Sequence, residues 1–104
     1  MATKQLQKFF EEHGFNVHFT DNNYKKFVEV ETWTDGGVNM VITLKPFTVK
    51  EFVEYVNGFD VDEEIDVYRQ DKHYCDNFTI RESLKDFETY KEMLKELVVK
   101  LEKL

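Results

Sequence analysis

The fold of this chain is decided by residues 27–44, which read FVEVETWTDGGVNMVITL. Apolar and polar residues alternate on both sides of Asp35-Gly36-Gly37, and this alternation is typical of strands that bury one face. A three-residue loop that contains glycine can join two such strands and set their register. In that register one face stays apolar, with Val28 opposite Leu44, Val30 opposite Ile42 and Thr32 opposite Met40. These residues therefore predict an antiparallel hairpin.

A further alternating stretch begins at Phe15 and precedes this hairpin. Asparagine tolerates the positive φ angles of a type I′ turn, so we expect a two-residue turn at Asn22-Asn23. That turn would place Val17 opposite Val28 and Phe15 opposite Val30. The sequence thus predicts a three-stranded antiparallel meander with one apolar face and one partly solvated face.

Helix signals flank the predicted sheet on both sides. Residues 3–13 gather apolar side chains on one side and end at Gly14, which favours a left-handed stop. Three capping boxes follow the sheet, and they begin at Thr48, Asp60 and Thr79. The helix that begins after the last box carries an apolar stripe along its whole length.

The length of 104 residues indicates one domain with a single hydrophobic core. We therefore predict an α+β fold in which residues 1–104 form a single small domain. The elements follow in the order α-β-β-β-α-α-α, and the three-stranded antiparallel meander packs against the C-terminal helices.

The formal charge of −7 is concentrated between Glu51 and Asp66, where seven acids and no base occur. Elsewhere acids and bases balance in number. A net acidic chain without clustered Lys and Arg is poorly suited to attract phosphates, so we expect no direct nucleic-acid binding.

The acidic segment supports three interpretations. In the first, its carboxylates occupy helix caps and first turns, where the helix dipole favours anions. In the second, Asp60 begins a calcium loop, but Ile65 stands where an EF-hand needs glycine, and calcium is disfavoured. In the third, an anionic face docks on a basic partner surface. The members of that face are Glu51, Glu54, Asp60, Asp62, Glu63, Glu64 and Asp66.

The second face of the predicted sheet carries three large apolar side chains, Phe27, Trp33 and Val41. If they are exposed, they form an apolar interface with charged borders. The alternative is that the helix at residues 3–13 covers them, and the need of that helix to bury its own aromatic residues favours the covered arrangement.

No catalytic, cofactor or metal motif stands out. Consecutive acids at a helix end do not isolate a catalytic pair. The cluster of Asp71, His73, Cys75 and Asp76 lacks the paired spacing of a zinc site. A single cysteine excludes an internal disulfide and indicates a reducing cytoplasm, while no apolar run is long enough to enter a membrane. We expect a non-enzymatic cytoplasmic protein without a cofactor.

These observations favour a protein-interaction module of a bacterial-type cytoplasm that presents its anionic face to a basic partner. A sharper hypothesis is an inhibitor or nucleic-acid mimic of the kind that mobile elements, including phages, encode. One alternative is a structural homodimer paired through the terminal amphipathic helix. Another is an enzyme or small-molecule-binding domain, which would need a cleft near Tyr55, Tyr68 and Tyr74.

Overall fold

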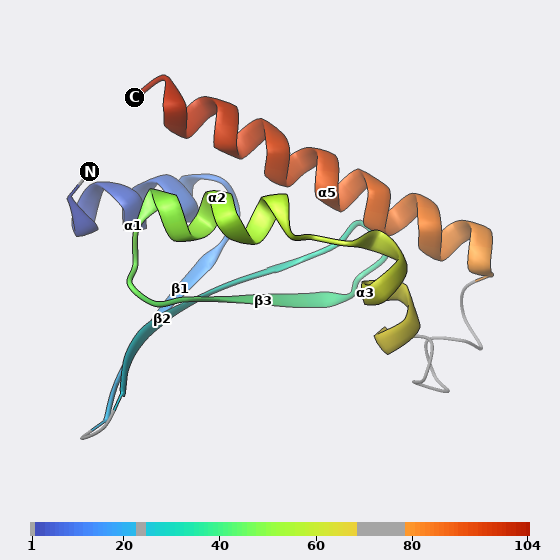
Figure 1. Cartoon of the computed structure of the whole chain (residues 1–104), viewed down its shortest axis with the longest axis horizontal. Helices are drawn as coiled ribbons and strands as arrows, with labels where there is room; N and C mark the ends of the chain where they lie inside the picture. Colours follow the sequence, from blue (N-terminus) through green and yellow to red (C-terminus); the bar gives the residue numbers. More distant parts are fainter. Residues whose placement is uncertain (1, 23–24, 69–78) are drawn as a thin grey trace.

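The computed structural model describes residues 2–22, 25–68 and 79–104. Its described elements are α1 (Thr3–Glu12), β1 (Asn16–Asn22), β2 (Lys25–Trp33), β3 (Asn39–Leu44), α2 (Val49–Asn57), α3 (Val61–Tyr68) and α5 (Ile80–Glu102). The predicted order α-β-β-β-α-α-α is confirmed, and Figure 1 shows the strands beneath α1, α2 and α5.

The strands form one antiparallel sheet in the order β1-β2-β3. The register of β2 with β3 is as predicted, and Gly37 adopts a φ of 87° at the end of their loop. The predicted register of β1 with β2 is wrong by two residues, because Val17 lies opposite Val30 instead of Val28. Side chains alternate with a period of two, so a shift of two residues keeps the same faces inward and alternation could not exclude it.

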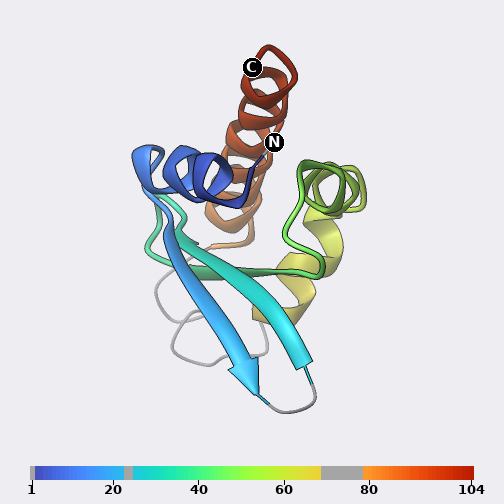
Figure 2. The ribbon, with the colours of Figure 1, turned by 90° about the vertical axis from the view of Figure 1, so that its left-hand side faces the viewer.

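All three longer helices, α1, α2 and α5, cover the same face of the sheet (Figures 1 and 2). The expectation that α1 covers the second face is therefore wrong. The side chains of Leu6, Phe9 and Phe10 are buried in the cluster that also holds residues of α2 and α5. One shared core buries these apolar side chains as effectively as a separate layer would, so α1 does not need the second face.

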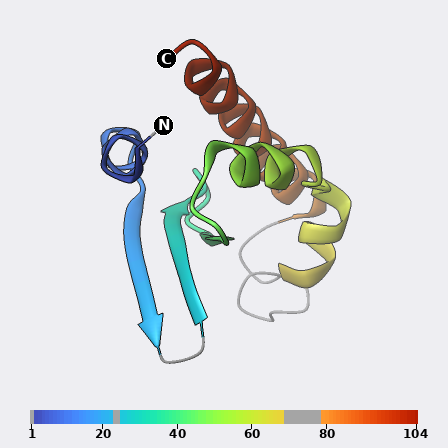
Figure 3. The same ribbon diagram turned by 60° about the vertical axis from the view of Figure 1, so that its left-hand side comes forward.

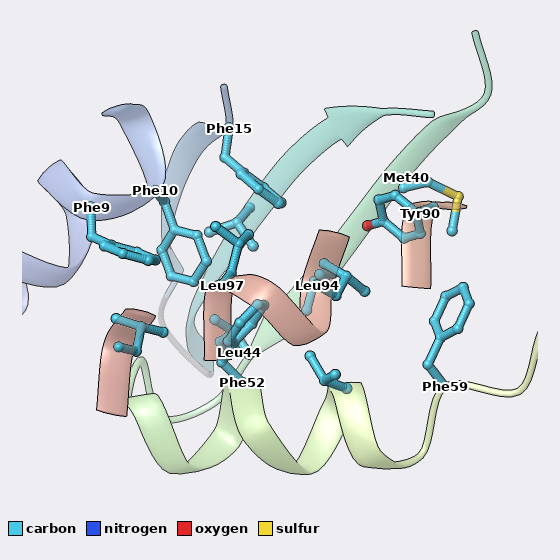
Figure 4. Close-up of a cluster of buried hydrophobic side chains, with 14 of the residues drawn as sticks. Phe9, Phe10, Phe15, Met40, Leu44, Phe52, Phe59, Tyr90, Leu94 and Leu97 are labelled. Carbon is cyan, nitrogen blue, oxygen red and sulfur yellow. The ribbon is translucent and has the colours of Figure 1, made fainter. Parts of the chain in front are cut away.

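Phe10 is at the centre of the aromatic part of this core, where it is fully buried. Its ring centroid lies 5.1 Å from that of Phe52 and 5.4 Å from that of Phe15, both edge to face, and 6.0 Å from that of Phe47. Figure 4 shows Phe10 in the same cluster as Phe52 of α2 and Leu97 of α5. Through this one side chain, α1 contacts α2 and the residue that precedes β1.

The helix starts follow the predicted capping signals. Thr48 Oγ1 accepts a hydrogen bond from the backbone N–H of Glu51 at 3.2 Å. At the start of α5 the box is reciprocal, since Thr79 Oγ1 accepts from Glu82 N–H and Glu82 Oε1 accepts from Thr79 N–H. Each cap satisfies backbone donors that have no partner within the helix.

Asp86 connects the β2–β3 loop to α5. Its Oδ2 accepts a hydrogen bond from the Thr34 hydroxyl at 2.6 Å, and its Oδ1 accepts one from the Gly36 N–H at 2.8 Å. Thr34 Oγ1 also accepts from the Val38 N–H at 3.0 Å. A buried carboxylate thus fixes the hairpin loop beside the helix, which defines how the sheet and α5 meet.

Away from this junction, the β1–β2 hairpin extends beyond the helices (Figure 3). Phe19 of β1 is exposed, although its ring centroid lies 5.9 Å from that of Phe47. None of the helices in the described ranges is both long and apolar enough to span a bilayer.

Candidate functional site

The predicted anionic residues lie on α2, on α3 and on the link between them; we call this set, Glu51, Glu54, Asp60, Asp62, Glu63, Glu64 and Asp66, the acidic face. Glu51 and Glu64 are half-buried and the other five are exposed. Four apolar side chains of the same stretch are buried, Phe52, Val56, Phe59 and Ile65. Burial of one side of each helix therefore turns most of the carboxylates outward.

Asp60 has a structural role at the start of α3. Its Oδ1 accepts hydrogen bonds from the backbone N–H groups of Asp62 at 2.9 Å and Glu63 at 3.3 Å. The side chains of Asp62 and Glu63 follow in the first turn, where the helix dipole favours negative charge. The capping interpretation is thus confirmed for Asp60, and first-turn positions also account for Glu51 of α2 and for Asp62, Glu63 and Glu64 of α3. It does not account for Glu54 and Asp66.

The acidic face is largely unneutralised within the described part of the chain. None of its seven carboxylates lies within 4.0 Å of a described Lys, Arg or His nitrogen. Lys91 of α5 borders a hollow of about 510 Å³ that Asp60 and Asp62 also line. Burial raises the pKa of Glu64, and the neighbouring charge of Glu63 raises it further. Glu63 and Glu64 thus repel each other, and a basic group brought against this pair would relieve that repulsion.

The calcium interpretation does not fit the backbone. Residues 61–68 form a helix, whereas a calcium loop must curl its backbone around the ion. In the ranges that the structure describes, no group of three or more His, Cys, Asp or Glu side chains could hold a metal ion. The other ligand candidates, Asp71, His73, Cys75 and Asp76, lie outside the described residues, as does Tyr74.

The second sheet face is open with respect to the described helices. Trp33 is 50% exposed and Val41 is 41% exposed, while Phe27 is half-buried. Trp33 of β2 pairs with Asn39 of β3, so Val41 is its diagonal neighbour, with the two residues about 7–8 Å apart. Phe27 is six residues from Trp33 along β2, which is about 20 Å. The three predicted interface residues therefore do not form one continuous apolar patch.

Polar side chains occupy the middle of this open face. The Glu31 carboxylate accepts hydrogen bonds from Asn39 Nδ2 at 3.1 Å and from His18 Nε2 at 3.3 Å. The bond from Asn39, followed by the bond from His18, lowers the pKa of Glu31. This arrangement orders three side chains from three adjacent strands without covering them.

Two features were not predicted from the sequence. One is the pair of hydrogen bonds that Asp86 accepts from Thr34 and Gly36, which we call the Asp86 tie. Its only signal in the sequence is an acid placed between Ser83 and Phe87 on the inner side of α5. The other is a groove of about 720 Å³ between α1 and the last turns of α5, lined by Phe9 and by several basic side chains. Its members are distant in sequence, so no local pattern indicates it.

Comparison with known proteins assigns no family. The chain matches no known family model, and it has no significant similarity to a curated protein or to a solved structure.

Proposed function

We propose that this protein is a non-enzymatic interaction module whose acidic face binds a basic surface of a partner protein. The observation that carries the proposal is the outward placement of the carboxylates of α2 and α3, none of them in an ion pair with a described base. Such a surface accelerates association with a cationic groove, and it can compete with a phosphate backbone for that groove.

The burial of the apolar side chains of α5 argues against the alternative of a helix-paired homodimer. The apolar stripe of α5 is buried in the protein's own core and is not available to a second copy. Its buried residues are Phe87, Tyr90, Leu94, Leu97 and Leu101. The exposed apolar residues of α5 are Ile80 at its start and Val99 near its end, and the exposed Leu104 lies beyond the helix. A surface made of these residues lacks the continuous seam that paired helices require.

The proposal is tested with a lysine- and arginine-rich peptide immobilised on a biosensor. One variant neutralises four acids of the acidic face, Glu51→Gln, Glu54→Gln, Asp62→Asn and Glu63→Gln, and keeps Asp60 as the cap. A matched variant neutralises four exposed acids elsewhere, Glu11→Gln, Glu12→Gln, Glu96→Gln and Glu102→Gln. Both variants change the formal net charge from −7 to −3, since four negative charges are removed from each.

We expect the acidic-face variant to bind about tenfold more weakly than the matched variant, and the wild-type affinity to fall steeply with salt. Circular dichroism checks that both variants remain folded. Equal losses in the two variants would mean that only net charge matters, and the acidic face would then have no special role.

If the acidic face mimics a nucleic acid, the protein must also compete with DNA for a DNA-binding protein. The wild-type protein should displace labelled duplex DNA from a histone-like DNA-binding protein, and the acidic-face variant should not. Peptide binding without any displacement would retain the interaction module and remove the mimicry.

A further inference from the structure

The junction of α1 with the C-terminal turns of α5 differs in charge from the rest of this acidic protein. A groove of about 720 Å³ opens there, within the size range of small-molecule pockets. Three lysines line it, Lys8, Lys100 and Lys103, against a single side-chain carboxylate, that of Glu12. The chain as a whole carries a formal charge of −7, so a net positive groove is a local reversal of sign.

The cations of this groove are only partly neutralised by the protein. Lys8 Nζ lies 3.7 Å from Glu12 Oε1, an exposed pair within α1. Neither Lys100 nor Lys103 lies within 4.0 Å of a carboxylate among the described residues. Lys100 lies in the last turn of α5 and Lys103 at its C-cap, where the helix dipole favours cations. This effect does not require an ion pair with their ammonium groups.

The floor of the groove is apolar and held in place. Phe9 is buried there, and the His13 ring packs against it with 4.3 Å between ring centroids. His13 Nδ1 donates a hydrogen bond to the Phe9 carbonyl oxygen at 2.7 Å, which fixes the imidazole as a wall. The side chain of Leu104 adds an exposed apolar wall opposite α1.

We propose that this groove binds an amphipathic carboxylate, with the carboxylate between Lys100 and Lys103 and the apolar chain against Phe9 and Leu104. The charge of the rim selects an anion, and the apolar floor selects a ligand with a hydrocarbon part. Figure 1 shows α1 beneath the C-terminal end of α5, which is where both parts of the ligand would meet the protein. This site is separate from the acidic face and does not depend on it.

The test titrates the ¹⁵N-labelled protein with decanoate and follows the backbone amide shifts by NMR. Acetate and decyltrimethylammonium serve as probes that keep only the anion or only the chain. We expect saturable shifts at Phe9, His13, Lys100 and Lys103 with decanoate, and about tenfold weaker binding of either other probe.

A pair of variants locates the site. Lys100→Gln with Lys103→Gln should weaken decanoate binding about tenfold. Lys50→Gln with Lys85→Gln removes the same charge from exposed positions on α2 and α5 and should leave the affinity unchanged. The inference is overturned by equal weakening in both variants, by equal binding of decyltrimethylammonium, by equally tight acetate binding, by shifts centred elsewhere, or by no saturable binding.

Discussion

The two faces of the sheet share three strands but differ in what covers them. On β3, Met40, Ile42 and Leu44 are buried beneath the helices, whereas Asn39 and Val41 on the other side are exposed. The covered face is apolar where it meets the core except at Thr32, whose hydroxyl donates a hydrogen bond to the Gly14 carbonyl oxygen. The open face combines Val41 and Trp33 with the hydrogen-bonded cluster around Glu31.

This difference arises because the helices bury their apolar sides against only one face of the sheet. The apolar sides of α1, α2 and α5 converge on one cluster, so the covered face provides most of the apolar burial that stabilises the fold. The residues of the open face are not needed for this apolar burial, so they can make contacts outside the core. Three predictions test the distinction.

The largest expected effect compares two neighbours on β3. Ile42→Ala removes a fully buried side chain and leaves a cavity, which should cost about 2–5 kcal/mol in the free energy of unfolding. Val41→Ala truncates an exposed side chain on the opposite face and should cost less than about 1 kcal/mol. Urea denaturation followed by circular dichroism measures both values. Equal losses would show that the open face is covered in solution.

A smaller effect is expected where the covered face meets α5. Asp86→Asn replaces one accepting oxygen by a donor, although Thr34 and Gly36 both donate to this side chain. The unmatched donors should cost about 1–3 kcal/mol in the free energy of unfolding. Asp35→Asn, at an exposed position in the same loop, should stay within about 0.5 kcal/mol of wild type. A neutral Asp86→Asn would show that the tie does not stabilise the junction.

The comparison also explains which parts of the fold the sequence could predict. Local signals were sufficient where neighbouring residues set the geometry, as in the loop that ends at Gly37 and the caps at Thr48 and Thr79. They also found Asp60 as a cap. In each case the residues that decide the structure lie within a few positions of one another.

Sequence reasoning was insufficient where distant segments meet. The choice of face for α1 depends on whether its aromatic side chains fit beside those of α2 and α5, and periodicity gives only the apolar side of each helix. The Asp86 tie joins residues 52 positions apart through side chains. For the candidate sites, the acidic face follows from local helix patterns, whereas the groove between α1 and α5 requires the packed structure.

The smallest effect concerns the polar cluster of the open face. Because Asn39 and then His18 donate hydrogen bonds to the Glu31 carboxylate, its pKa in the folded protein lies below the ordinary value of 4.5. A carboxyl with a lowered pKa stabilises the fold above the unfolded pKa, and this contribution is lost as the pH falls through the folded pKa. The pKa of Glu64 is raised, so its linkage has the opposite sign: stability decreases as the pH rises from the unfolded pKa to the folded pKa.

Carboxyl ¹³C NMR titration separates the two groups. We expect Asn39→Ala and His18→Ala each to move the pKa of Glu31 upward toward its ordinary value, and neither change to affect Glu64. Since the cluster is solvated, both substitutions should change the free energy of unfolding far less than Ile42→Ala does. An unchanged Glu31 pKa in Asn39→Ala would mean that these side chains are not ordered in solution, and the open face would then differ from the covered face in order as well as in exposure.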